Sequence, residues 1–389
     1  VAEPGYYYYD NTTGVQKWKT FGGGEQDLRY INTNHITKDA GVGSNGTSVG
    51  WGVHNIGLGA GVLQSNNLGH QNVAIGAGSL GLNTTGGQNV ALGVGTLGLN
   101  TTGSSNIAIG SEALQGQSST IPMTGDFNIA LGMNALKNNT TGNNNIAQGY
   151  QALFSNTTGK NNIAIGENAL KGQGWMTPMT GNYNIALGQN ALKDNTTGGL
   201  NIALGQDALY SNTTGGWNIA QGLHALYKNT SGEQNIALGR NALYQNTSGK
   251  QNIGIGDGAL SDNLTGQFNT AVGGYAGSWI KGNGNVHIGS GGGLPSAELD
   301  NVVLIGRLTN TLNATTGEDN VILLGDTSSA APKVGVGTYK PQAKLDVAGA
   351  VRVANDTSAC TSANEGAIRY VSASKKFQGC DGTNWVNLN

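Results

Sequence analysis

Apolar and polar residues follow a unit of 17 residues that repeats through more than half of the chain. The unit reads N-[IV]-[AG]-[IL]-G-x-x-A-L-x-x-N-T-T-G-x-x, and its leading asparagine falls at positions 55, 72, 89, 106, 128, 145, 162, 184, 201, 218, 235, 252 and 269. We number the unit from this asparagine, so that in the unit beginning at Asn184 the residues Ile185–Leu187 occupy positions 2 to 4 and Gly198 is position 15.

Positions 1 to 5 of the unit predict a short β-strand followed by a turn. Large and small apolar residues alternate in "NIALG", and a period of two is typical of a strand with one buried face. Glycine at position 5 permits a sharp turn, and "NTTG" supplies further turn residues. Seventeen residues are too few for a repeat built from a pair of helices, which needs roughly 33–47. The sequence therefore predicts an all-β chain in which each unit is one coil of a β-solenoid (β-roll), with about 16 coils stacked about 4.8 Å apart.

Stacked coils place the same residue types above one another. The leading asparagines are expected to form an amide ladder, which includes Asn184, Asn201, Asn218 and Asn235. We expect the Ile and Leu residues at positions 2 and 4 and the Leu at position 9 to point inward. The small residue at position 3 is then expected to point outward and to provide close packing between chains, with a column that faces solvent as the alternative. Its members are Ala186, Ala203, Ala220, Ala237 and Gly254.

Departures from the repeat divide the chain into four parts. Residues 1–50 are predicted to form an N-terminal β cap or attachment segment, with a hairpin over Gly5–Phe21. Residues 51–300 form the repeat shaft, residues 301–345 contain degenerate coils and a connector, and residues 346–389 form a C-terminal β tip or cap. Two steps of 22 residues within the shaft carry related insertions, Gln115–Gly125 and Lys171–Gly181, which we expect to be loops on one side of the solenoid.

Composition excludes several classes of protein. The chain has 389 residues, of which 66 are glycine, but glycine does not fall at every third residue as in collagen. Charged residues are 11% and the net charge is −2, which gives no electrostatic reason to bind nucleic acid. The chain contains no run of 18 apolar residues, so the sequence predicts no membrane-spanning helix. Cys360 and Cys380 are predicted to form a disulfide in an oxidising compartment, with two unpaired thiols as the alternative.

Motifs associated with catalysis do not occur in the context that their chemistry requires. The G-x-G-x-x-G patterns at 76–81 and 93–98 recur with the repeat and precede no helix, so they do not predict a dinucleotide site. The pattern around Ser48 also lacks a following helix and an acid–histidine pair. The five histidines show no metal-ligand spacing. We therefore expect no enzyme, no cofactor and no metal, unless a carboxylate groove for glycan cleavage forms between chains.

Aromatic residues recur at two variable positions of the unit. Position 10 holds Phe154, Tyr210, Tyr227 and Tyr244, and position 17 holds Phe127, Tyr183, Trp217 and Phe268. Exposed aromatic side chains on a polar surface are suited to the apolar faces of sugars. Aromatic ladders also stabilise solenoids or fill grooves between chains, and the sequence leaves both interpretations open.

The units "N-I-A-I-G-x-x-A-L", from about Asn55 to Gly289, resemble the β-roll head repeats of trimeric autotransporter adhesins, the YadA-like head. They are still more similar to the "NTAIGYxALxxNTTG" repeats of phage tail fibres and of fibre-like bacterial surface proteins. Val334–Val353 looks like the connector that precedes the C-terminal domain of such fibres, and Gly366–Leu388 resembles the short β-tip unit beside it. The 17-residue unit is longer than that of the adhesin heads, and we expect no self-cleaving chaperone domain or membrane anchor.

The resemblance implies a parallel homotrimer with a left-handed β-roll shaft and an adhesive role. We accordingly expect an extracellular fibre that projects from a virion or cell and attaches to a surface, with host-cell glycan as the partner. The alternatives are a structural subunit that polymerises head to tail, an ice-binding protein that uses the threonines of "NTTG", and a glycan depolymerase.

Overall fold

The structure is a computed structural model that describes residues 54–174, 177–291, 300–306, 353 and 359–388. It also describes the backbone of six short strands: β1 (Gly5–Asp10), β2 (Val15–Thr20), β3 (Glu25–Asp27), β19 (Ile322–Leu324), β20 (Val334–Val336) and β21 (Leu345–Val347). The chain divides into two compact units, Val1–Leu323 and Leu324–Asn389.

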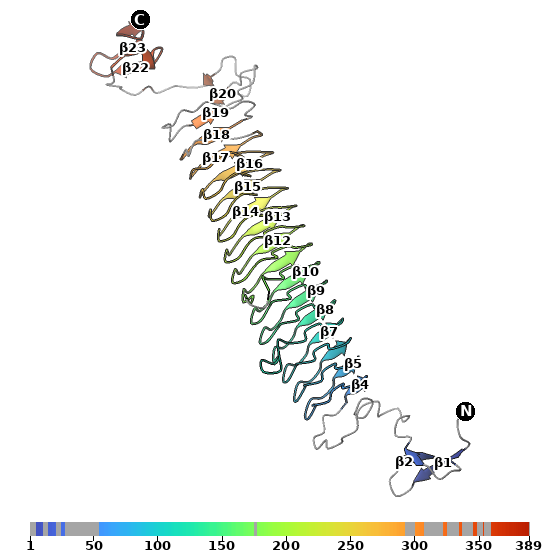
Figure 1. Cartoon of the computed structure of the whole chain (residues 1–389). Helices are drawn as coiled ribbons and strands as arrows, with labels where there is room; N and C mark the ends of the chain where they lie inside the picture. Colours follow the sequence, from blue (N-terminus) through green and yellow to red (C-terminus); the bar gives the residue numbers. More distant parts are fainter. Residues whose placement is uncertain are drawn as a thin grey trace. The chain divides into compact units, whose positions relative to one another are not determined.

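A parallel sheet dominates the first unit (Figure 1). Its 16 strands follow one another in chain order from β4 to β19. Apart from β19 they are β4 (Ile56–Leu58), β5 (Val73–Ile75), β6 (Val90–Leu92), β7 (Ile107–Ile109), β8 (Ile129–Leu131), β9 (Ile146–Gln148), β10 (Ile163–Ile165), β11 (Ile185–Leu187), β12 (Ile202–Leu204), β13 (Ile219–Gln221), β14 (Ile236–Leu238), β15 (Ile253–Ile255), β16 (Thr270–Val272), β17 (Val286–Ile288) and β18 (Val303–Ile305).

The predicted β-solenoid is confirmed, with about 14 turns of about 17 residues. Equivalent residues pair in register, as Ile185 does with Ile202 in β11 and β12. Segments outside the strands also bond from coil to coil: the Leu192 N–H donates to the Ala208 carbonyl (2.9 Å) and the Thr196 N–H to the Thr213 carbonyl (3.0 Å). Each coil is thus tied to its neighbours on several sides, which compensates for strands of only three residues.

The prediction for the two faces of the strand is wrong. The Ala at position 3 is fully buried in successive coils. The residues at positions 2 and 4 point outward instead, and several of them are 36–57% exposed, including Ile56, Leu58, Ile109 and Ile219. A period of two shows which residues share a face, but it does not show which face is inside.

From β5 to β16 the strand contributes only a small residue to the interior. Buried Ala at positions 3 and 8 and buried Leu at position 9, such as Ala186, Ala191 and Leu192, fill each coil together with asparagine. Gly254 occupies position 3 in one coil, and a Cβ atom there would lie 3.1 Å from the Ala259 carbonyl oxygen. In this coil the interior has space for little more than a methyl group at position 3. The predicted inward direction of the Leu at position 9 is confirmed.

The predicted ladder of leading asparagines is confirmed inside the solenoid. Asn201 Nδ2 donates to Asn184 Oδ1 (3.1 Å) and to the Gly215 carbonyl (2.9 Å). The Asn201 backbone N–H also donates to Asn184 Oδ1 (3.1 Å). Asn218 and Asn235 continue the same pattern. These amides are fully buried, and a buried polar group is stable there because each of its hydrogen bonds is made.

A second asparagine ladder occupies position 12 and was not predicted. Asn212 Nδ2 donates to Asn195 Oδ1 (2.8 Å) and to the carbonyl of Gly215 (2.9 Å), so Gly215 receives bonds from both ladders. The ladder comprises three blocks: Asn66, Asn83 and Asn100; Asn139 and Asn156; and Asn195, Asn212, Asn229, Asn246 and Asn263. The sequence pattern predicts only a turn at this asparagine.

The two insertions interrupt the second ladder. In the insertion coils the buried side chains of Met123 and Met179 lie opposite Asn100 and Asn156, with which they form isolated parallel bridges. Because methionine offers no amide, Asn100 Oδ1 and Asn156 Oδ1 are buried without a hydrogen-bond partner. The insertions thus replace one polar layer of the interior by an apolar one.

Tight turning requires left-handed backbone at three non-glycine positions of a typical coil. Asn190, Leu192 and Leu200 have φ values of 55°, 53° and 61°. Asparagine tolerates this conformation, whereas leucine does so at a cost of roughly 1–2 kcal/mol. Leucine is nevertheless used in successive coils because its side chain fills the interior.

Both ends contain antiparallel β-structure. Strands β1 and β2 pair over Gly5–Thr20, as the predicted hairpin requires, and β3 pairs with β2. In the second unit, β22 (Ile368–Val371), β23 (Lys376–Cys380) and β24 (Trp385–Leu388) form a three-stranded sheet, which we call the tip sheet. The described residues contain one 3₁₀ turn, Ser362–Asn364, and no helix with the length and apolarity to cross a bilayer.

Candidate functional site

The outward side of the parallel sheet is an extended apolar surface. We call it the aliphatic face and define it as positions 2 and 4 of the strands β4 to β18. These positions hold Ile, Leu and Val with three polar exceptions, Gln148, Gln221 and Thr270, and they hold no charged residue. The alanine column, which the sequence predicts to form the contact between chains, is buried and has no accessible surface.

Aromatic residues at position 17 are exposed on the surface of the solenoid. This position comes directly before the inward Asn of position 1 and has left-handed backbone, with φ of 59° at Tyr183 and 57° at Trp217. Tyr183, Leu200 and Trp217 occupy this position in consecutive coils and are 58%, 47% and 59% exposed. The residues before Leu200 and Trp217 are Gly199 and Gly216, so no side chain stands next to either on that side. Tyr183 and Trp217 are thus accessible members of the predicted aromatic set, as are Phe127 (61% exposed) and Phe268 (57%) at the same position.

The tyrosines at position 10 stack on one another, as predicted. The ring centroids of Tyr210 and Tyr227 are 5.1 Å apart and those of Tyr227 and Tyr244 are 5.2 Å apart. Lys193 Nζ lies 4.7 Å from the Tyr210 centroid and Lys228 Nζ lies 5.6 Å from that of Tyr244. Tyr227 is therefore covered by a ring on each face, and Tyr210 by a ring and an ammonium group, so these faces are not open to stacking with a sugar.

Polar contacts fix the tyrosine column further. Lys193 Nζ donates to the Tyr210 hydroxyl (2.6 Å), and this bond raises the pKa of Lys193. Burial raises the pKa of Tyr227. His224 approaches the rings of Tyr227 and Tyr244 edge-on, at centroid distances of 5.2 and 6.1 Å. Its Nε2 is 3.5 Å from Asp207 Oδ2. The column and its neighbours thus make a closed set of contacts, which supports a stabilising role.

Phe154 is not part of this column. It is half-buried, and the same position holds Lys171 and Lys193 in the two coils between Phe154 and Tyr210. Phe154 therefore shares a repeat position with the three tyrosines without being part of their column.

Catalytic motifs found in the sequence do not form sites in the described part of the chain. Both G-x-G-x-x-G patterns lie where β5 and β6 turn into the next segment of the coil, and no helix follows either strand. Ser48 and His35 lie outside the described residues. Within 54–174, 177–291, 300–306 and 359–388, no three His, Cys, Asp or Glu side chains are grouped to hold a metal ion.

The burial of one histidine was not predicted from the sequence. His287 occupies position 3 of β17, where most other coils have alanine, and it is fully buried. Its Nδ1 accepts a hydrogen bond from the Gly277 N–H (2.7 Å), so the ring is neutral. Burial lowers its pKa. The His at a position that is Ala or Gly in the strands from β4 to β16 was the available signal in the sequence.

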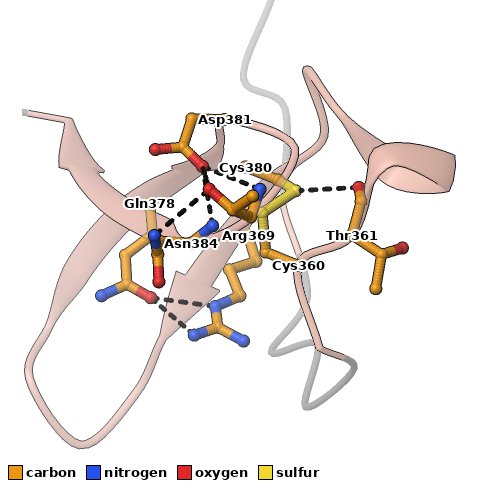
Figure 2. The surroundings of a disulfide bond; sticks show 8 residues. Cys360, Thr361, Arg369, Gln378, Cys380, Asp381 and Asn384 are labelled. Atoms are coloured by element: carbon orange, nitrogen blue, oxygen red, sulfur yellow. Dashed lines mark hydrogen bonds between the residues drawn. A yellow bond between two sulfur atoms is a disulfide. The ribbon is translucent and has the colours of Figure 1, made fainter.

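The predicted disulfide joins Cys360 to Cys380 (Figure 2). On the same face of the tip sheet, the Arg369 guanidinium donates to Gln378 Oε1 (2.9 and 2.7 Å) and lies 4.1 Å from the Trp385 ring. The opposite face is apolar, carries no charge and is largely exposed. It contains Ile368, Tyr370, Phe377, Val386 and Leu388.

Comparison of the chain with protein-family models, with curated proteins and with solved structures finds no match.

Proposed function

We propose that the protein is a non-enzymatic extracellular fibre whose shaft is a parallel homotrimer, and that it projects from a virion or cell and attaches to glycans on a surface. The aliphatic face carries this proposal. The resemblance to trimeric fibres supplies the number of chains and the adhesive role, and the disulfide fits an oxidising compartment.

The size of the aliphatic face favours association. If each outward aliphatic side chain exposes roughly 60 Å², two per coil over about 14 coils expose on the order of 1,500 Å². The largest apolar patch of a typical monomer is about 300–600 Å². A standard interface buries about 800 Å² on each partner. Chains that shield this face from water in one another therefore gain a large hydrophobic stabilisation.

Parallel packing suits the repeat. Around an axis along the solenoid, each coil meets the same coil of its neighbours, so the same residue types face one another at every level of the interface. The uncharged apolar face of the tip sheet supports self-association in the same way. Neither surface places like charges opposite one another.

The association is tested by the mass of the protein in solution. We expect a trimer by light scattering, and dissociation when Ile202→Asp, Ile219→Asp and Ile236→Asp are combined, because each places a charge on the aliphatic face. These side chains point outward, so circular dichroism should show that the coils remain folded. Thr214→Asp, at exposed position 14, is the matched control and should leave the trimer intact. A wild-type protein that is monomeric at all concentrations contradicts the proposal.

Glycan attachment is assigned to the exposed residues of position 17. Trp217 and Tyr183 present open ring surface, and aromatic rings stack on the apolar faces of sugars. Trp217→Ala should lower the signal on a glycan array at least tenfold while the trimer mass is unchanged. Tyr227→Phe retains the stacked column and should bind as the wild type does. Equal binding by Trp217→Ala removes this role.

Two alternatives each have an observation in their favour. Strand β4 ends the 16-stranded sheet, and head-to-tail pairing at this edge would build a filament that electron micrographs of purified protein would reveal. Exposed threonines at position 14, such as Thr197 and Thr214, form a column that an ice surface could bind. The absence of thermal hysteresis would exclude ice binding.

A further inference from the structure

The repeat creates an ambiguity for the proposed trimer. Nearly identical coils present nearly identical pairs of aliphatic side chains, so a chain displaced along the axis by one coil still packs Ile and Leu against Ile and Leu. Such a displacement leaves only the coil at each end without a partner. Hydrophobic packing by itself therefore discriminates weakly between registers.

Two glutamines break the uniformity of the aliphatic face. Gln148 in β9 and Gln221 in β13 occupy position 4, where the other strands from β4 to β18 have Leu, Ile or Val. Both side chains are exposed and point outward. Within the described part of the chain neither side-chain amide has a hydrogen-bond partner. Gln221 flanks fully buried Ala220, so its outward direction is fixed by the strand.

The fold gives these glutamines no role within a single chain. They are not in either interior asparagine ladder, and they interrupt a surface that is otherwise aliphatic at this position. In a parallel trimer each would meet the same glutamine of the two neighbouring chains. An amide both donates and accepts, so three glutamines at one level can satisfy one another.

We propose that Gln148 and Gln221 set the axial register of the chains in the fibre. This inference rests on the proposed parallel association. Displacement by one, two or three coils places every one of these amides against Leu, Ile or Val, where it loses its partners and is buried unsatisfied. Displacement by four coils aligns Gln148 of one chain with Gln221 of the next, but leaves four coils at each end unpaired. A single polar residue that fixes the register of an otherwise apolar interface is well attested in coiled coils.

Register is measured by disulfide trapping between chains. Leu187→Cys places a thiol at position 4 of β11, on the aliphatic face, and Leu204→Cys does so one coil later. Cysteines bond only when their Cα atoms lie within about 7 Å. In an in-register fibre, chains with Leu187→Cys should cross-link mainly to each other. Co-refolding with differently tagged Leu204→Cys chains should give little mixed product. Peptide mapping verifies that Cys360–Cys380 remains paired.

The decisive variant is Gln148→Leu combined with Gln221→Leu. We expect it to assemble with a melting temperature at least equal to that of the wild type, while the ratio of mixed to like cross-links rises several-fold. Gln189→Leu with Gln206→Leu, at exposed position 6 outside the aliphatic face, is the matched control and should leave the ratio unchanged.

The outcomes separate this inference from the proposed function. An unchanged cross-link ratio in the Gln148→Leu/Gln221→Leu variant overturns the register role while leaving the trimer in place. Loss of assembly in that variant also overturns it, because the glutamines would then be needed for affinity and not for register. A monomeric wild type that forms no cross-link between chains contradicts the proposed function itself.

Discussion

Buried asparagine is the residue on which the shaft depends most directly. A leading asparagine serves as acceptor for the next coil and as donor to the previous one, so its removal affects two levels of the stack. Asn201 Oδ1 accepts from both the backbone N–H and the side chain of Asn218. No other residue type of that size offers both a donor and an acceptor at the required positions.

We therefore expect Asn201→Ala to destabilise its coil by about 2 kcal/mol. The change leaves the buried Asn218 N–H without its acceptor and creates a small cavity. Native-state hydrogen exchange at residues 201–234 measures the loss, since a repeat protein need not unfold in one step. Gln189→Ala, at an exposed position, should change protection little. Equal protection in the two variants would show that the ladder contributes no stability.

His287 makes the C-terminal coils sensitive to acid. Its folded-state pKa is lowered by burial, so the folded chain binds the proton less readily than the unfolded chain does. Stability from the neutral ring is present above the unfolded pKa of about 6.5 and is lost as the pH falls below it. Protection of residues 276–288 should decline between pH 7.5 and pH 5. His287→Ala should remove that decline, and His70→Ala, at an exposed site, should not.

At the scale of the element, the coil tolerates side chains at some glycines and not at others. Position 15 stacks so closely that a Cβ atom on Gly198 would overlap the Gly215 carbonyl oxygen and Asn195 Oδ1. The adjacent Gly199 is less crowded, since its Cβ would lie 3.0 Å from the Asn182 carbonyl oxygen. The repeated glycine of "NTTG" is thus required by stacking distance and not by a special φ angle.

This difference predicts opposite outcomes for neighbouring residues. Gly198→Ala should lower the stability of the solenoid by several kcal/mol or prevent folding, because the backbone must separate two coils to admit the methyl group. Gly199→Ala should cost less than about 1 kcal/mol. Thermal unfolding followed by circular dichroism compares the two, and a similar melting temperature for both would contradict the stacking argument.

Sequence patterns predicted the coil, but they did not predict which side chains of the strand point inward and which point outward. The fixed spacing of Asn, Ala, Leu and Gly specified the solenoid, the first asparagine ladder and the stacked tyrosines, because stacking repeats whatever one coil contains. The direction of Ile185 and Ala186 was mistaken, because the rule that large apolar residues lie inside fails in a coil whose interior is already filled by Leu192 and asparagine. Asn195 was assigned to a turn for a similar reason: a residue can form a turn and still point inward.

On the scale of the whole molecule, the two units have different sources of stability. The shaft relies on ladders that run through many coils, whereas the tip sheet has three short strands and a covalent bond between Cys360 and Cys380. A small sheet with one exposed apolar face is marginal without such a bond.

Reduction should therefore affect the tip alone. Cys360→Ser with Cys380→Ser should destabilise the tip sheet by about 3 kcal/mol, the value for a loop of this length. Hydrogen exchange should increase across 359–388 and remain unchanged in the coils. Wild-type protein treated with a reducing agent provides the comparison. Increased exchange in the shaft would show that the two units are coupled.

The constant step between ladder partners also has a genetic consequence. Removing or duplicating one whole unit leaves each remaining asparagine, alanine and leucine above an equivalent residue, so recombination between neighbouring repeats yields another folded protein. Its length differs by one strand spacing, about 4.8 Å. Extra residues that do not complete a unit must leave the stack, as the insertions before Met123 and Met179 do. Recombination can thus change the length of the shaft in fixed increments while the structure of each coil stays the same.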